Sequence, residues 1–263
     1  MGERTVEISK SGRSRLFRGR MPPMWLARFR GRWQRHIASH VVAAAGAATI
    51  ALFLFAKVGE DVFEHESGSF DGAVQRWMIG HRTPSLFRVF TWVTNAGGTP
   101  PLLVVTAGIC LWLWRVHGRH AASGAIAAPV VAVALFNGIK LFFGRVRPAG
   151  ALHFGIHSYA FPSGHATVSI AAAVTVGYVL WRERFIRGAW AAFVAISVPL
   201  LVGFSRTYLD VHWATDVLGG WCVGLFVSGI AAVIYEHLRH DPDVLVAEGH
   251  HSAASPSSPS STV

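Results

Sequence analysis

The chain has 263 residues, of which 52% are hydrophobic and only 14% are charged. Soluble domains carry about a quarter charged residues, so this composition argues against a soluble protein and predicts a membrane protein. The net charge is +10, but ten of the 24 Lys and Arg residues lie within residues 1–37, in front of an apolar stretch. A basic arm in that place favours contact with anionic lipid on the cytoplasmic side over nucleic-acid binding.

The arm, residues 1–37, is expected to contain an interfacial helix. Trp25, Phe29 and Trp33 recur at helical spacing and alternate with arginines, a pattern typical of a helix in the headgroup region. The charged part is too long for the beginning of a cleaved signal peptide. The first membrane span follows at residues 40–57, close to the ~20 residues that cross a bilayer.

Residues 58–98 are more polar than the first span, and this composition predicts a surface cap rather than a membrane span. An acidic stretch comes first. Two short amphipathic helices follow, broken at Thr83-Pro84, and Phe70 and Val74 contribute to the apolar face of the first. Neither helix is long or apolar enough to cross a membrane.

Five further apolar stretches complete an all-α bundle of six transmembrane helices, which we place in a membrane domain at residues 38–236. They are expected at residues 99–114, 121–141, 164–181, 188–204 and 215–236. The loops 115–120 and 182–187 are basic, which puts them and both termini in the cytoplasm by the positive-inside rule. The remaining connections then lie outside the cell membrane, at residues 58–98, 142–163 and 205–214.

The tail, residues 237–263, is polar and rich in Ser and Pro, so we expect it to be disordered. Its histidines could bind a metal ion, but a solvated tail is the simpler interpretation; they are His240, His250 and His251. The two cysteines, Cys110 and Cys222, lie in apolar runs and are expected to be small packing residues, not a disulfide or a metal site.

The outer connections contain residues suited to binding an oxyanion. Lys140, Arg147 and Arg206 supply three cations, and guanidinium groups match phosphate oxygens in bidentate geometry. Ser163 and Gly164 begin a predicted helix, where free backbone N–H groups and the helix dipole favour a negative ligand. Ionisable groups clustered at a membrane boundary are a functional indication in themselves.

Two histidines accompany these cations. His212 and Asp216 are four residues apart at a helix start and share a face, so the carboxylate can fix the imidazole tautomer and leave the other nitrogen free. His165 stands beside the predicted anion site. Two histidines that flank a bound phosphate indicate one nucleophile and one proton donor.

These residues form three spaced segments: Lys140 with six residues before Arg147-Pro148, then Pro162-Ser163-Gly164-His165, then Ser205-Arg206 with five residues before His212 and three more before Asp216. The order and spacing resemble the complete three-part motif of the type 2 phosphatidic acid phosphatase superfamily, which includes the vanadium haloperoxidases. The resemblance implies a haloperoxidase-like helical core in the six-span bundle.

The resemblance also implies a role for each residue. His212 would attack phosphorus and form a phosphohistidine, with Asp216 fixing its tautomer. His165 would protonate the leaving oxygen and then activate water. The remaining motif residues would bind the substrate phosphate: Lys140, Arg147, Ser163, Gly164 and Arg206. No metal or other cofactor is expected, because side-chain cations supply the charge and the motifs contain no carboxylate cluster for Mg²⁺.

The expected activity is hydrolysis of a lipid phosphomonoester or pyrophosphate at the outer face of the cell membrane. Compatible substrates are undecaprenyl pyrophosphate, phosphatidic acid and phosphatidylglycerol phosphate. A lipid phosphotransferase would use the same site, and a transporter that only binds anions is the alternative from another class. We expect five nearby residues at unspecified or neighbouring positions to be loop residues, surface charges or substrate contacts: Arg145, His153, His157, Tyr208 and Asp210.

Overall fold

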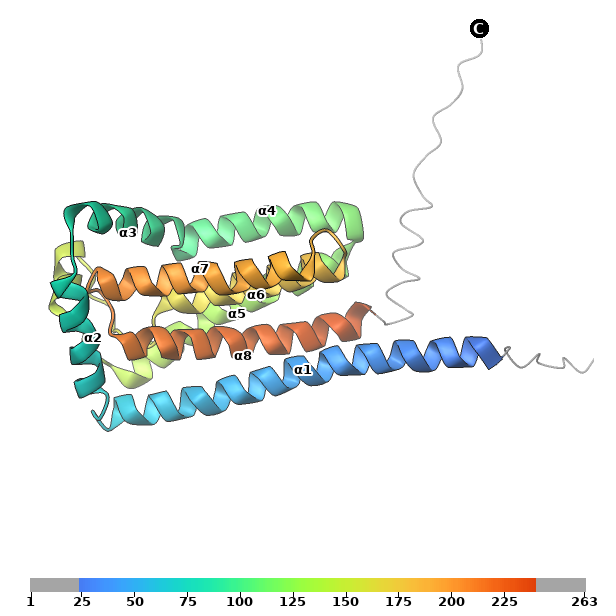
Figure 1. Cartoon of the computed structure of the whole chain (residues 1–263), viewed down its shortest axis with the longest axis horizontal. Helices are drawn as coiled ribbons and strands as arrows, with labels where there is room; N and C mark the ends of the chain where they lie inside the picture. The colour runs from blue at the N-terminus through green and yellow to red at the C-terminus, as the bar shows by residue number, and fades with distance from the viewer. Residues whose placement is uncertain (1–23, 240–263) are drawn as a thin grey trace, which may run out of the picture. The chain divides into compact units, whose positions relative to one another are not determined.

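The computed structural model describes residues 24–239, with side chains from Ser39 onward, and every regular element in that part of the chain is helical (Figure 1). The predicted all-α membrane bundle is therefore confirmed. The chain divides into two compact units, residues 1–37 and 38–263. Residues 24–37 of the first unit are helical, but the side chains that define the predicted interfacial helix lie outside the described residues, as does the tail from residue 240.

Six of the described helices are long and apolar enough to cross a membrane: α1 (Met24–Phe63, from Ser39), α4 (Thr99–His117), α5 (Arg119–Phe143), α6 (Gly164–Arg182), α7 (Gly188–Tyr208) and α8 (Ala214–Arg239). Each contains the whole stretch predicted from composition. The ends differ most in α1, which continues six residues beyond the predicted 57. Helix α7 continues four residues beyond the predicted 204 and so includes Arg206 in its last turn.

Helices α6 and α8 form the centre of the bundle and are its two most buried spans. Helix α6 packs against α4, α5, α7 and α8. Glycines on α8 permit the close approach, since a Cβ on Gly220 would lie 2.7 Å from the backbone oxygen of Ser163, and one on Gly224 would lie 2.5 Å from that of Thr167. Small residues at helix contacts are the usual means of close packing in membranes. Ser163 is thereby held against the first turns of α8.

The predicted cap consists of α2 (Gly68–Gly80) and α3 (Pro84–Ala96). Thr83 caps α3, because its hydroxyl accepts a hydrogen bond from Leu86 N at 3.2 Å, and Pro84 occupies the first helical position. Tyr208, at the end of α7, accepts a hydrogen bond from Thr83 N at 3.0 Å. Since Tyr208 is also buried, it braces the corner between α2 and α3 and does not face a substrate.

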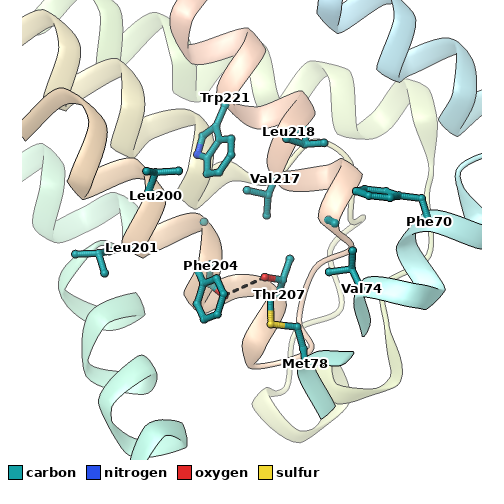
Figure 2. A pocket seen from close by; sticks show the side chains of 12 residues that line it. Phe70, Val74, Met78, Leu200, Leu201, Phe204, Thr207, Val217, Leu218 and Trp221 are labelled. Carbon is teal, nitrogen blue, oxygen red and sulfur yellow. Dashed lines mark hydrogen bonds between the residues drawn. The ribbon is translucent and has the colours of Figure 1, made fainter. Parts of the chain in front are cut away.

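The two faces of helix α2 make different kinds of contact. Phe70, Val74 and Met78 line an apolar pocket of about 530 Å³, whose other walls come from α7 and α8 (Figure 2). Asp71 and Gln75 lie on the other face and make polar contacts with residues from the motif region, which are described below. This amphipathic helix therefore connects the cap to the bundle through both apolar and polar contacts.

The α5–α6 loop, residues 144–163, begins at Gly144, whose left-handed backbone (φ +58°) ends α5 in the manner of a glycine C-cap. A short 3-10 helix, Ala149–Phe154, follows. Asp210 holds this loop in place, accepting hydrogen bonds from Gly150 N at 3.1 Å and from Gln75 at 2.7 Å. Asp210 is accordingly a structural residue of the loop and is not available to a substrate.

Candidate active site

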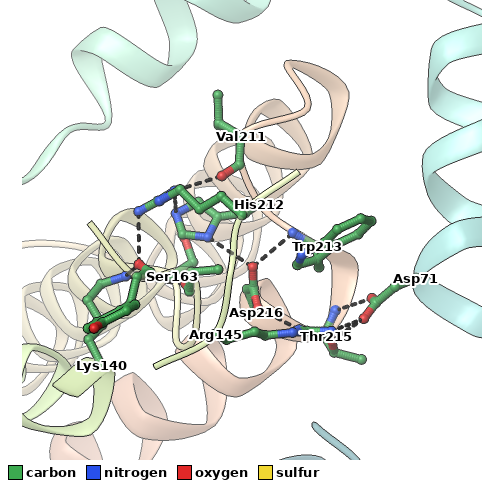
Figure 3. Close-up of polar contacts among 12 residues, drawn as sticks. Asp71, Lys140, Arg145, Ser163, Val211, His212, Trp213, Thr215 and Asp216 are labelled. Carbon is green, nitrogen blue, oxygen red and sulfur yellow. Dashed lines mark hydrogen bonds and ion pairs between the residues drawn. The ribbon is translucent and has the colours of Figure 1, made fainter. Parts of the chain in front are cut away.

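The motif residues come together at one end of the bundle, where α5 and α7 end and α6 and α8 begin. Lys140 lies in the last turn of α5, and Arg206 lies in the last turn of α7. Ser163 precedes the first residue of α6, and His212 lies in the turn that leads into α8 (Figure 3). The Ser163 backbone N–H donates to the carbonyl of Asp216 at 2.9 Å, which joins the second and third motifs directly.

Asp216 orients His212. The carboxylate oxygen Oδ2 lies 3.2 Å from His212 Nδ1 and accepts a hydrogen bond from Trp213 N at 2.9 Å. The i, i+4 spacing predicted this contact. With Nδ1 donating to the carboxylate, the proton of the neutral imidazole is on Nδ1, and Nε2 carries the lone pair.

Arg147 lies on the Nε2 side of the same imidazole. One guanidinium nitrogen lies 2.8 Å from His212 Nε2 and donates to the Val211 carbonyl at 2.7 Å. The guanidinium also donates to Ser158 O through Nε at 2.6 Å, so the α5–α6 loop holds it in place. Burial lowers the pKa of Arg147, while the charge of Asp216 works against this effect. A cation is thus fixed where an oxyanion near Nε2 would be neutralised.

The electrostatic environment keeps His212 neutral. Burial is the main cause that places the pKa of His212 well below its usual value, and the charges of Arg147, Arg206 and Lys140 and the proximity of His165 lower it further. A histidine in this environment retains a free electron pair at Nε2 under neutral and mildly acidic conditions. The three cations predicted from the motifs therefore all act on the imidazole of His212.

Two buried donors of the predicted phosphate site have no hydrogen-bond partner within the described part of the chain: Ser163 Oγ and Arg206 Nε. Arg206 is anchored by its other end, since one of its terminal nitrogens donates to Thr94 Oγ1 of α3 at 2.8 Å. Buried polar groups are normally paired, and an unpaired one calls for an explanation. An anion bound between them would provide the missing acceptor for both.

Lys140 and His165 are the remaining charged or titratable residues of the predicted site. Lys140 is buried, and its ammonium donates to the carbonyl oxygens of Tyr159 at 2.5 Å and Ala160 at 3.3 Å, so it ties the end of α5 to the loop that precedes α6. Its role in phosphate binding stays a prediction. His165, in the first turn of α6, is partly exposed, and a Cβ built on Gly98 at the start of α4 would lie 3.5 Å from its Nε2.

The interpretation of Arg145 as a surface or substrate-side charge was wrong. Its guanidinium donates at 2.6 Å to Asp216 Oδ1 and at 2.6 Å to Asp71 Oδ2 of the cap (Figure 3). Only 16% of the side chain is exposed. An arginine at the end of an apolar helix resembles an anchor in sequence, and only the folded cap supplies the second carboxylate.

Three residues near the site could not be recognised from the motifs. Asp71 and Thr94 come from the cap helices, and Gly98 comes from the turn before α4. Their positions depend on how residues 68–98 fold over the bundle, which no local spacing encodes. In the described residues, no three His, Cys, Asp or Glu side chains are grouped as ligands for a metal ion.

The fold and the site together define a membrane-embedded helical bundle with a buried histidine among cations that are arranged around an oxyanion position. The sequence model of the PAP2 superfamily matches residues 118–240, which include all of the motif residues. The part of the chain that contains the site thus matches the PAP2 superfamily, and the protein is an integral membrane phosphatase of the PAP2 type.

Known relatives agree with this assignment. Phosphatidylglycerophosphatase B of Bacillus subtilis is 29% identical over 188 residues, which are 68% of this chain and 90% of that protein. An undecaprenyl-diphosphatase of Sulfolobus acidocaldarius is 34% identical over 92 residues, 35% of this chain and 41% of that protein. The crystal structure of a transmembrane PAP2-type phosphatidylglycerolphosphate phosphatase from Bacillus subtilis superposes with a TM-score of 0.65 at 26% identity, covering 75% of this chain and 98% of that one.

Proposed function

We propose that this phosphatase hydrolyses a lipid phosphomonoester or pyrophosphate at the extracytoplasmic face of the cell membrane, through a phosphohistidine on His212. The observation that carries the proposal is the orientation of His212, with Nδ1 at Asp216 and Nε2 directed at Arg147. A protein that only bound an anion would need the cations but not an imidazole with a fixed tautomer.

In the first step, His212 Nε2 attacks phosphorus, the P–N bond forms, and the bond from phosphorus to the leaving oxygen breaks. His165 gives its proton to that oxygen. Arg147 and Arg206, with the Ser163 hydroxyl and the N-terminus of α6, neutralise the charge on the phosphoryl oxygens. The contact between Arg147 and His212 Nε2 must yield as the phosphoryl group comes between them, and the guanidinium then donates to a phosphoryl oxygen.

In the second step, His165 accepts a proton from water, the resulting hydroxide attacks phosphorus, and the P–N bond breaks. Inorganic phosphate is released and His212 is neutral again. The proton that left His165 in the first step is restored in the second, so the cycle needs no other co-reactant. A lipid alcohol in place of water would give the phosphotransferase that remains the second candidate.

The physiological substrate is proposed from the relatives and the membrane setting. Phosphatidylglycerol phosphate is favoured by the relative that aligns over 90% of its own length, whereas the undecaprenyl-diphosphatase aligns over 41%. Undecaprenyl pyrophosphate and phosphatidic acid present the same terminal phosphate on a membrane-held tail. The lipid provides the apolar part of the substrate, and the outer loops bind its phosphate.

The test is phosphate release by the purified protein in detergent micelles from each of these three lipids, with EDTA present throughout. We expect wild-type turnover, no detectable turnover for His212→Ala, and a loss of about 10²–10⁴-fold for His165→Ala. A label from the substrate phosphate should remain on the protein in base and leave in acid, as a phosphohistidine does. Activity that survives His212→Ala, or that is lost in EDTA and restored by Mg²⁺, would contradict the mechanism.

A further inference from the structure

A chain of buried charges connects the cap to the residue that orients His212. Asp216 is fully buried on α8, Arg145 donates to it from the loop after α5, and Asp71 of α2 accepts from the other nitrogen of the same guanidinium. Ser67, just before α2, accepts a third hydrogen bond from Arg145 at 3.0 Å. The predicted phosphate site does not include Arg145 or Asp71: Asp71 lies outside the three motifs, and Arg145 is one of the six unspecified residues between Lys140 and Arg147.

Arg145 is poorly placed to bind a substrate. Both of its terminal nitrogens donate to carboxylates, and the guanidinium also lies 5.9 Å from the ring centre of Trp213. A single positive charge that is shared between two buried carboxylates has little attraction left for an anion in solution. Its position between Asp216 and Asp71 indicates an action on the protein rather than on the phosphate.

Asp71 does more than pair with Arg145. Its Oδ1 accepts a hydrogen bond from Thr215 N at 2.9 Å, and its Oδ2 accepts one from the Thr215 hydroxyl at 2.6 Å. Thr215 lies in the first turn of α8, where backbone N–H groups lack partners within the helix. A carboxylate of α2 thus satisfies the start of α8, one residue before Asp216.

We propose that Arg145 and Asp71 are positioning residues, through which α2 holds Asp216 in the orientation that His212 needs for attack on phosphorus. This inference rests on the proposed role of His212. The Asp216 carboxylate has three partners: His212, the Trp213 backbone N–H and Arg145. Without a fixed Arg145, the Oδ1 side of a fully buried carboxylate loses its charged partner, and the carboxylate can rotate away from Nδ1.

The test is a double-mutant cycle on Asp71 and Asp216, with kcat and KM measured on the three lipids named above. Asp71→Asn keeps the size and an acceptor oxygen but removes the charge. We expect kcat to fall roughly 10- to 100-fold, the usual effect of an outer partner of an oriented imidazole. KM should stay within about twofold, because the phosphate-binding cations are untouched. In the Asp216→Asn background, Asp71→Asn should cause no further loss.

A buried ion pair far from the site provides the matched control. Glu236 at the other end of α8 is 1% exposed and pairs with Arg182 at 2.5 and 2.8 Å. Glu236→Gln also removes one charge from a buried pair, so it measures the general cost of loosening the bundle. We expect it to change the melting temperature but to leave kcat within about twofold of wild type.

Several outcomes would overturn the positioning role. They are a wild-type kcat in Asp71→Asn, an equal fractional loss in the wild-type and Asp216→Asn backgrounds, or an equal loss in Glu236→Gln. If Asp71→Asn does not fold, Arg145→Lys replaces it in the cycle, since an ammonium keeps the charge but lacks the fork that reaches both carboxylates. An inactive wild type, or an active His212→Ala, would instead refute the proposed function itself.

Discussion

The behaviour of His212 follows from its neighbours more than from its residue type. An exposed histidine changes charge near pH 6.5, but here burial, three cations and a second histidine all lower the pKa. The carboxylate of Asp216, which would have the opposite effect, is itself shared with Arg145. The neutral form that a nucleophile requires is therefore built into the folded state.

This environment predicts a pH dependence of stability. The folded state keeps His212 neutral below pH 6.5, whereas the unfolded chain takes up a proton near its usual pKa, so the free energy of unfolding should fall as the pH falls below about 6.5. The contribution is at most about 1.4 kcal/mol per pH unit. His212→Asn should flatten the dependence of the melting temperature on pH between 4.5 and 6.5. His157→Asn, at an exposed position of the α5–α6 loop, is the control and should follow wild type. Parallel curves for His212→Asn and wild type would contradict the prediction.

At the residue scale, the sequence predicted the contacts that depend on local spacing. The contact of His212 with Asp216 required only the periodicity of a helix start. Arg145 was misinterpreted because its partner in α2 is 74 positions away, and no periodicity links residues across that separation. The link between Arg206 and Thr94 was missed for the same reason.

At the scale of helices, composition located all six spans but not all of their ends. Hydropathy falls at Ser205-Arg206, which suggests a loop, yet α7 continues to Tyr208 because its last turn is buried under the cap. Helix ends depend on backbone hydrogen bonds and on burial, neither of which an average over apolar residues reports. Similarly, α1 continues through part of the acidic stretch to Phe63.

The close contact of α6 with α8 predicts a position where one methyl group is costly. A Cβ on Gly224 would lie 2.1 Å from Ile170 Cγ2 and 2.5 Å from the Thr167 backbone oxygen, so the two helices must move apart. We expect Gly224→Ala to destabilise the protein by about 1–3 kcal/mol, the usual cost of overpacking, seen as a lower melting temperature in detergent. Gly108→Ala on α4 is the matched control, because its Cβ would meet nothing within 4 Å. Equal melting temperatures for the two variants would show that α6 and α8 are packed less tightly than the distances at Gly224 indicate.

At the scale of the whole membrane domain, its two ends differ in chemistry. The motif residues occupy the ends of α5 and α7 and the beginnings of α6 and α8. At the opposite ends, Glu183 lies 2.9 Å from His117 and also accepts a hydrogen bond from the Tyr235 hydroxyl. Burial raises the pKa of Glu183, but hydrogen bonds from His120 and Tyr235 and the charges of Arg239 and His117 outweigh it and lower the pKa to about 2. A carboxylate that stays ionised balances the basic residues on this side.

The basic loops beside Glu183 provide the argument for orientation. Positively charged loops stay in the cytoplasm. The end of the bundle with Arg182 and Arg187 should therefore face the cytoplasm, and the α5–α6 loop with His157 should face outward. The two native cysteines, Cys110 and Cys222, are free and buried, which confirms the packing role expected for them and leaves little background for cysteine labelling.

We therefore expect a membrane-impermeant maleimide to label His157→Cys in intact cells, because position 157 is exposed in the outer loop. Arg187→Cys, exposed at the start of α7, should react only after the cells are permeabilised. If neither variant is labelled before permeabilisation, the maleimide does not reach the cysteines in the folded protein. Denatured protein from the same cells would then react fully, which serves as the control. Labelling of Arg187→Cys alone in intact cells would reverse the topology and place the phosphatase site on the cytoplasmic face. The lipid phosphate would then have to come from the inner leaflet, so this experiment also decides which leaflet supplies the substrate.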